Sequence, residues 1–363
     1  FVRSLQNVRT MRLGYDVDPV VLVQANPRGV KFTPAEATAL EQRLVEEARA
    51  IPGVRSATPA VSVPFWSNEG RGLSVQGIDN VRKLGHFILQ AGAPEYFQTV
   101  GTRILRGRAF DRRDVAGAPG VVVVSEGMAR ALWPNEDPLG RCIRIGADTM
   151  PCTTVIGVAE DMRVRSLTDA REYTYYIPIA QYGNAAGALF VRVAGDAADY
   201  ADAVRRRLQL LMPGTAYVIA QPLRELIDPN VRSWEFGATM FVAFGALALA
   251  LAAIGLYSVV AYGVAQRQQE IGVRIALGAS RSHVMRLVMG GGVRLVAAGV
   301  LIGGAIALWA GRWAAALLFQ ESPHDPVVYA VGAAVLVGVA IMATAMPALA
   351  ASRVDPNAAL RAE

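Results

Sequence analysis

One uninterrupted apolar run constrains the fold of this chain more than any other sequence feature. The run from Phe236 to Val264 holds no charged residue over 29 positions. About 20 apolar residues in a helix suffice to cross a bilayer core that is about 30 Å thick. A buried helix of a soluble protein is usually shorter and keeps a polar stripe. The run therefore predicts a transmembrane helix.

Two further apolar runs follow the first. Leu295–Gly311 has 17 residues, the lower limit for a span, but the flanking Arg294 and Arg312 can extend toward the lipid headgroups. Val327–Ser352 is uncharged throughout. The sequence thus predicts a water-soluble domain, residues 1–235, and a membrane domain, residues 236–363, with spans at about 236–264, 290–312 and 327–352.

The basic residues are concentrated in one loop. The chain of 363 residues has a net charge of +6, yet its first 235 residues hold 28 basic and 25 acidic residues, as an ordinary soluble domain does. Residues 265–294 hold five arginines against one acid: Arg267, Arg274, Arg281, Arg286 and Arg294 against Glu270. Short arginine-rich loops stay in the cytoplasm. The basic balance therefore indicates an orientation in the lipid bilayer and gives no reason to expect a nucleic-acid partner.

This orientation places the water-soluble domain outside the cytoplasm. The loop between the second and third spans suits the outer face, and the C-terminus, with Arg353 and Arg361, returns to the cytoplasm. Residues Phe1–Arg12 contain neither a signal-peptide core nor a span. We therefore expect a further transmembrane helix upstream of Phe1.

Strand and helix signals alternate along the water-soluble domain. Thr33 and Pro34 are typical of a helix start, and Pro52-Gly53 of the end of that helix. The expected strands are Val20–Asn26, Val54–Val63, Leu73–Gly77, Phe87–Ala91, Val121–Val124, Ile143–Ile145, Thr153–Ala159, Tyr175–Ile177, Phe190–Val193 and Tyr217–Ala220, with a helix ending before Pro134 and another over Asp196–Leu211. The mixture of hairpins and strand–helix pairs favours an α+β domain of two subdomains over a doubly wound sheet.

The two cysteines flank a predicted hairpin turn. Cys142 and Cys152 are equidistant from a turn centred near Ala147, so they can face each other across the two strands. An oxidising compartment would allow a disulfide between them. Two unpaired buried thiols are the alternative that the sequence leaves open.

The sequence shows no recognisable catalytic or metal-binding pattern. His86, His283 and His324 lack the spacing of metal ligands. A Ser-centred G-x-S-x-G is absent, and neither lysine follows a glycine as in a phosphate-binding loop. We expect a non-catalytic membrane subunit with no cofactor and no bound metal.

The arginine-rich loop is patterned as two short helices. Ile271 and Ile275 lie one helical turn apart, Gly278 can end the first helix, and Ser280 can cap the next one. Such a segment can lie flat on the bilayer with its arginines at anionic headgroups. Alternatively, it docks into a partner protein.

The second span contains a small-residue motif. Gly299 and Gly303 form a G-x-x-x-G pattern, which allows two membrane helices to pack closely. Glycine is also common in spans without such a role. Close helix packing at these two positions is therefore one of two interpretations.

Several motifs together resemble one family. EIGVRIALGAS, preceded by QRQQ, and the C-terminal MPALAASRVDPNAALRAE are similar to the membrane domain of FtsX-like and MacB-like ABC permeases. SEGMARALWPNEDPLGRCIRIG and TVIGVAEDMR resemble the MacB-type periplasmic core domain. The opening FVRSLQNVRTMRLGYDVDPVVLV is especially similar to the second half of duplicated acidobacterial-type permeases.

The resemblance implies partners and an ATPase-coupling site. It implies a multi-pass protein of the bacterial inner membrane, a separate cytoplasmic ABC ATPase, a second permease half or a second copy of the chain, and a periplasmic adaptor. In such permeases a coupling helix sits on the ATPase. The matching residues here are Glu270, Ile271, Gly272, Arg274, Leu277, Gly278 and Ala279.

The resemblance implies a permease subunit that transmits ATPase-driven motion across the membrane to a periplasmic domain, for efflux or export. Spans without a central charge suit this mechanism, because an intramembrane charge usually marks a polar pathway. Two other functions remain open: a non-transporting regulator of a periplasmic enzyme, and a membrane-anchored scaffold without an ATPase.

Overall fold

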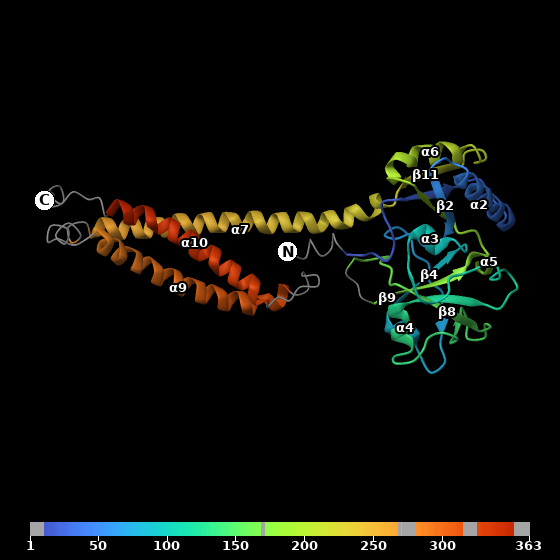
Figure 1. Cartoon of the computed structure of the whole chain (residues 1–363), viewed down its shortest axis with the longest axis horizontal. Coiled ribbons are helices and arrows are strands. Elements are labelled where there is room, and N and C mark those ends of the chain that lie inside the picture. Colours follow the sequence, from blue (N-terminus) through green and yellow to red (C-terminus); the bar gives the residue numbers. More distant parts are fainter. Residues whose placement is uncertain (1–10, 168–170, 268–269, 271–280, 315–324, 352–363) are drawn as a thin grey trace. The chain divides into compact units, whose positions relative to one another are not determined.

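The computed structural model describes residues 11–167, 171–267, 270, 281–314 and 325–351. Its contacts divide the chain into two compact units, which we call the core domain (Thr10–Arg232) and the helical unit (from Ser233 onward). The core domain combines two sheets with helices, and the helical unit consists of long helices (Figure 1). The predicted fold class, an α+β domain followed by long apolar helices, is confirmed.

The first subdomain is a four-stranded antiparallel sheet with two helices. Its elements are β1 (Val20–Asn26), α2 (Pro34–Arg49), β2 (Val54–Ala60), β10 (Ala188–Val193), α6 (Ala197–Gln209) and β11 (Tyr217–Pro222). The strand order is β11-β1-β10-β2, a split β-α-β arrangement. Helix α2 begins where the sequence predicts, because Thr33 and Glu36 form a capping box.

The second subdomain is inserted between β2 and β10. Its elements are β3 (Leu73–Ser74), η1 (Val81–Leu84), β4 (His86–Gly92), α3 (Tyr96–Val100), β5 (Ile104–Gly107), β6 (Val121–Ser125), α4 (Glu126–Leu132), β7 (Cys142–Ile145), β8 (Thr153–Ala159), β9 (Glu172–Pro178) and α5 (Ile179–Tyr182). The sheet order is β3-β7-β8-β6-β9-β4, and β5 also pairs with β8. The pairs β4–β9 and β6–β8 are parallel and the others antiparallel.

Strand β1 is buried on both faces, which explains its continuous apolar sequence. Val21 and Val23 pack with helices α2 and α6, whereas Val20 and Leu22 pack into the cluster on the opposite face. Side chains of a strand alternate between faces, so a strand covered on both sides needs apolar residues at every position. The run VVLV therefore places β1 at the centre of the domain.

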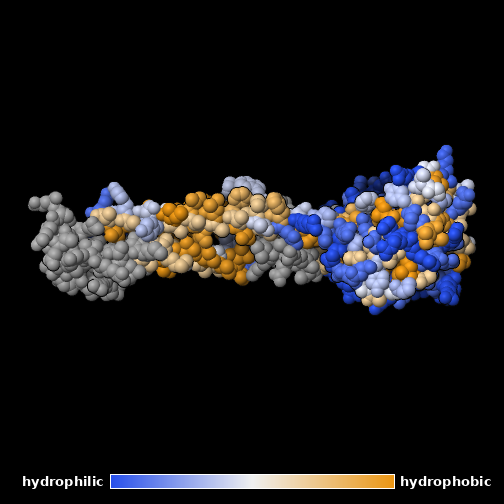
Figure 2. Space-filling view, turned by 90° about the horizontal axis from the view of Figure 1, so that it is seen from above, coloured by the Kyte–Doolittle hydropathy of each residue, from blue (hydrophilic) through white to orange (hydrophobic). Residues whose placement is uncertain are grey.

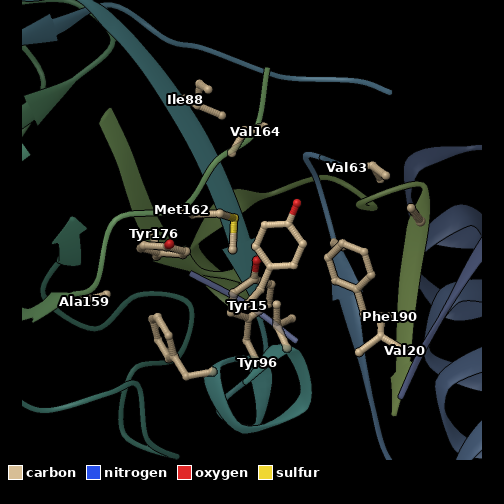
Figure 3. Packing of buried hydrophobic residues seen from close by; sticks show 14 of the residues in the cluster. Tyr15, Val20, Val63, Ile88, Tyr96, Ala159, Met162, Val164, Tyr176 and Phe190 are labelled. Atoms are coloured by element: carbon tan, nitrogen blue, oxygen red, sulfur yellow. The ribbon is translucent and has the colours of Figure 1, made fainter. Parts of the chain in front are cut away.

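Two buried tyrosine hydroxyls lie in this second cluster without a hydrogen-bond partner among the described residues. They belong to Tyr15 and Tyr176, which lie in one cluster with apolar side chains such as Met162 and Phe190 (Figure 3). Burial raises the pKa of each of these two phenols far above its usual range. A buried hydroxyl that makes no hydrogen bond opposes folding, because it loses its bonds to water.

Replacing Tyr176 with phenylalanine should therefore not destabilise the protein. We expect Tyr176→Phe to raise the free energy of unfolding by about 1 kcal/mol. The adjacent Tyr175 is the matched control, because its hydroxyl accepts a hydrogen bond from the Arg71 backbone N–H at 3.2 Å. Tyr175→Phe should lower the free energy of unfolding by about 1 kcal/mol. Thermal unfolding of both variants tests this pair, and a loss of stability in Tyr176→Phe would contradict it.

The helical unit contains the three expected apolar segments. The helices are α7 (Arg224–Gln266), α9 (Arg281–Ala314) and α10 (Pro326–Ala351). Among the described residues, α7 and the Pro326–Ala345 part of α10 are long and apolar enough to span a membrane, and α9 has a shorter apolar stretch, Val296–Gly311. Apolar side chains cover these helices, whereas the core domain is largely hydrophilic (Figure 2).

Helix α7 begins earlier than the apolar run from which it was predicted. Its first residue is Arg224, and its first turns belong to the core domain, where Ile227 is buried. No helix or strand was predicted for residues 221–235. This segment mixes charged and apolar residues and includes Pro229, a residue that usually interrupts a helix.

Candidate functional site

The predicted ATPase-coupling segment lies between helices α7 and α9. Helix α7 ends at Gln266 and α9 begins at Arg281. Glu270 is described and exposed. The other predicted coupling residues lie outside the described residues: Ile271, Gly272, Arg274, Leu277, Gly278 and Ala279. Their contact with an ATPase stays a prediction.

The G-x-x-x-G motif lies on α9. A Cβ atom added at Gly299 or at Gly303 would meet no heavy atom of the described residues within 4 Å. Within the described part of this single chain, neither glycine makes a close helix contact. Close helix packing at these two positions stays a prediction.

Cys142 is the first residue of β7, and Cys152 directly precedes β8 on the loop side of the β7–β8 hairpin. Their sulfur atoms are at bonding distance and their Cα atoms are 5.5 Å apart. The strand register pairs Cys142 with Thr154 and Ile143 with Thr153, so the turn is centred one residue later than the sequence suggested. Cys142 and Cys152 are thus diagonal neighbours across the two strands.

We expect these cysteines to form a disulfide in the mature protein. Alkylation without a reductant should leave both cysteines unmodified, as measured by mass spectrometry. Alkylation after reduction should add two alkyl groups. Modification of both cysteines in the unreduced protein would contradict the expectation.

Residues 11–19, which lead into β1 and which we call the incoming segment, are held in place by one carboxylate. It belongs to Glu160, whose side chain is only 9% exposed. Arg12 donates to it from Nε at 2.8 Å and from its terminal nitrogen at 2.7 Å. Arg103 donates from its backbone N–H at 2.8 Å and from its guanidinium at 3.0 and 2.9 Å. We call these three residues the Glu160 clamp.

Hydrogen bonds dominate the charge state of the Glu160 clamp. Burial disfavours the ionised carboxylate, but the hydrogen bonds from Arg12 and Arg103 outweigh it and lower the pKa of Glu160 to about 2. The carboxylate is therefore ionised at all physiological pH values. The clamp joins the start of the domain to the residue that directly follows β8, 148 residues further along the chain.

Further ion pairs connect the incoming segment to both ends of the fold. Asp16 pairs with Arg192 of β10, and Asp18 pairs with Arg224, the first residue of α7. The Leu223 backbone N–H also donates to Val20 O at 2.9 Å. The core domain thus holds the segments by which the chain enters it and leaves it close together.

Two cavities border helix α2. The larger, which we call the junction cleft, has a volume of about 640 Å³ and lies between α2 and the residues around α5. The smaller, the inner chamber, has a volume of about 210 Å³ and lies between α2 and the sheet of the first subdomain. Glu41 of α2 lines both cavities.

Glu41 is an acid at a buried position. Its side chain accepts the backbone N–H of Ala186 at 2.6 Å and that of Gly187 at 3.3 Å. Burial raises the pKa of Glu41, although these two hydrogen bonds oppose the shift. The burial of Glu41 could not be predicted from the sequence, because a single acid in an amphipathic helix gives no signal of burial.

The described residues contain no cluster of three or more His, Cys, Asp and Glu side chains that could hold a metal ion. Glu160 falls within TVIGVAEDMR, one of the motifs quoted above. The resemblance therefore contained a signal for the Glu160 clamp, whereas the pattern of charges along the sequence contained none.

Comparison with known proteins adds two family matches. Residues 1–210 match the MacB-like periplasmic core domain, and residues 242–356 match the FtsX-like permease C-terminal domain. The first match covers more than half of the chain.

Curated relatives include export proteins. The chain is 25% identical over 327 residues to "Macrolide export ATP-binding/permease protein MacB 2" of Aeromonas hydrophila, covering 86% of this chain and 47% of the relative. It is 26% identical to the MacB protein of the same description from Burkholderia cenocepacia, covering 91% of this chain and 46% of the relative. The chain thus spans about half the length of these relatives.

A solved structure also matches part of the chain. The periplasmic region of MacB from Actinobacillus actinomycetemcomitans aligns with 62% of this chain and 97% of that structure, at 16% identity and a TM-score of 0.44.

Proposed function

The chain belongs to the MacB-like periplasmic core domain family and carries an FtsX-like permease domain, and on this premise we propose that it is the permease subunit of an ABC exporter. The observation that carries the proposal is the order of the two matched domains along one chain, shared with relatives described as macrolide exporters. In this proposal ATP hydrolysis takes place on a separate ABC ATPase, as the resemblance of the coupling motif to FtsX-like and MacB-like permeases implies.

The proposed mechanism is transmission of motion across the inner membrane. The segment between α7 and α9 receives the closing motion of the ATPase in the cytoplasm. Helix α7 contains both the apolar run and, in its first turns, Ile227 of the core domain. A packed helix moves as a unit, so a displacement of α7 changes the position of the core domain in the periplasm.

The ion pairs of the core domain support this mechanism. The Asp18–Arg224 pair links the incoming segment to the start of α7, and the Glu160 clamp fixes that segment to the residue that directly follows β8. A domain held at both of its connections follows a displacement as a rigid body, instead of unfolding locally at one connection.

The duplicated acidobacterial-type arrangement provides the second permease half in our proposal. That half, or a second copy of this chain, completes the dimer that two ATPases drive. The resemblance of the first 23 residues to the second half of such permeases supports this part of the proposal. A periplasmic adaptor is the third expected partner, and the C-terminus then lies in the cytoplasm.

Charge reversal in the coupling segment tests the proposal. Tagged protein should co-purify with an ABC ATPase of the same organism, and Glu270→Lys combined with Arg274→Glu should reduce the recovered ATPase at least tenfold. A tenfold loss corresponds to about 1.4 kcal/mol, which is within reach of two reversed ion pairs.

The matched control for this test is Arg112→Glu, which reverses an exposed charge of the core domain. It should leave the recovered amount of ATPase unchanged. Undiminished recovery with the double variant, or wild-type protein that retains no ATPase, would overturn the coupling site and favour a scaffold.

A further inference from the structure

The inner chamber and the junction cleft share one lining residue, and it carries a carboxylate. The junction cleft is lined by both polar and apolar residues, among them Ile179 and Asn184 from the second subdomain. Ligand sites occur preferentially at such junctions between structural units. The residue common to both cavities is Glu41, whose side chain is 8% exposed.

The carboxylate of Glu41 accepts hydrogen bonds from the described residues through only one of its two oxygens. Oε2 accepts both backbone hydrogen bonds, from Ala186 and Gly187. Among the described residues, no donor bonds to Oε1, and this oxygen is not fully buried. The backbone bonds therefore fix the orientation of the carboxylate and leave one strong acceptor for a ligand.

The walls of the inner chamber are apolar. Apart from Glu41, the side chains that line it are hydrophobic: Val23, Ala25, Pro27, Phe32, Ala37, Leu40, Leu44, Ala185, Ala188, Leu189 and Met212. A cavity of about 150 Å³ with apolar walls is known to hold benzene. The inner chamber, at about 210 Å³, therefore has room for a single ring or a short alkyl chain.

The junction cleft favours cations. Glu41, Glu46 and Glu95 line it, against Arg49 as the one basic residue among its lining side chains. Arg49 is already engaged, since it bonds to Ala57 O at 2.8 Å and pairs with Glu95 at 3.4 Å. Acidic groups that line a cleft raise the local concentration of cations.

We propose that the inner chamber and Glu41 bind a small apolar ammonium ion. The ring or alkyl group lies among the apolar side chains of the inner chamber, and the ammonium group donates to Oε1 of Glu41. A neutral analogue leaves the buried carboxylate without a cationic partner, and an anion is repelled by it. The site involves the core domain alone, so it goes beyond the proposed function and does not depend on it.

Benzylammonium, benzyl alcohol and benzoate are suitable probes, because they share one ring and differ in charge. We expect calorimetric titration of the full chain in lipid nanodiscs, with empty nanodiscs as the blank, to show benzylammonium binding at least tenfold more tightly than benzyl alcohol. Benzoate should show no binding. Equal affinities for the ammonium ion and the alcohol would overturn the proposal.

Two variants separate the roles of the carboxylate and the chamber. Glu41→Gln keeps an oxygen for the backbone N–H groups of Ala186 and Gly187, and it should weaken benzylammonium binding at least tenfold without changing that of benzyl alcohol. Ala37→Phe fills the chamber and should abolish the binding of both probes. Because Ala37 is half-buried at the cavity wall, this variant also tests the proposal if Glu41→Gln fails to fold.

Glu46→Gln distinguishes the two cavities, since Glu46 lines the junction cleft but not the inner chamber. It should weaken benzylammonium binding far less than Glu41→Gln does, because Glu46 acts only on the local concentration of cations. A Glu46→Gln effect as large as that of Glu41→Gln would place the cation in the junction cleft and contradict the proposed site. Binding that survives Ala37→Phe would contradict it as well.

Discussion

Gly14→Ala is expected to lower the free energy of unfolding of the core domain by roughly 3 to 5 kcal/mol. Gly14 has a φ of +83°, a conformation that disfavours residues with a Cβ atom. A Cβ atom at this position would also lie 2.1 Å from the carbonyl oxygen of Asp161. The clashing atom is backbone, so no side-chain rotation can relieve the contact.

Accommodation of this Cβ atom requires the incoming segment to move away from the domain. Leu13 O accepts the Arg163 backbone N–H at 2.9 Å, and Gly14 O accepts the Thr102 hydroxyl at 2.7 Å. A shift that relieves the clash breaks both hydrogen bonds and displaces Arg12 from the Glu160 clamp. The loss of stability should therefore be largest in the incoming segment, which the proposed mechanism requires to be rigid.

Hydrogen exchange and thermal unfolding of the purified protein measure this effect. The backbone amides of residues 13–20 should lose protection in Gly14→Ala. Gly117→Ala is the matched control, because Gly117 has a φ of +81° but nothing within 4 Å of an added Cβ atom. It should cost about 1 kcal/mol from backbone strain alone. Similar losses in the two variants would show that the contact with Asp161 is unimportant.

The membrane segments and the main strands could be predicted from the sequence, because their signals are local. The length of an uncharged run is a property of consecutive residues, and so is the continuous apolar sequence of β1. The strand–turn–strand pattern of β7 and β8 is also local, and its hairpin is confirmed.

Short and polar elements could not be predicted, because other parts of the chain determine them. Strand β5 exists by pairing with β8, and α3 has only five residues, four of which are buried against neighbouring elements. The first turns of α7 contain a proline, and burial of Ile227 in the core domain stabilises them there. Tertiary packing outweighs local propensity in each case.

The side chains of the candidate sites are in contact only after folding. Glu160 lies 148 positions from Arg12, and Glu41 lies 145 positions from Ala186. No spacing rule connects residues at such separations. The predicted coupling residues around Arg274 are the opposite case, since the prediction comes from one continuous sequence motif.

Glu160→Gln should lower the free energy of unfolding by about 2 kcal/mol at pH 7, because it removes the charge that five hydrogen bonds from Arg12 and Arg103 converge on. The figure is below the sum of five charged hydrogen bonds, because the two arginine side chains are 42% and 64% exposed and regain water when released. Glu126→Gln is the matched control. Glu126 meets Arg130 at 3.5 Å on the surface, so its loss should cost less than about 0.5 kcal/mol.

The pH dependence of this difference identifies its cause. The pKa of Glu160 is lower in the folded protein than the 4.5 expected of the unfolded chain, so its contribution is complete above pH 4.5 and declines as the pH falls toward about 2. The gap in stability between wild type and Glu160→Gln should therefore be constant from pH 7 to about pH 5 and should narrow markedly by pH 3. Denaturant unfolding at these three pH values measures it. A gap that stays the same at pH 3 would mean that Glu160 acts through packing, and that the ionised carboxylate does not hold the incoming segment in place.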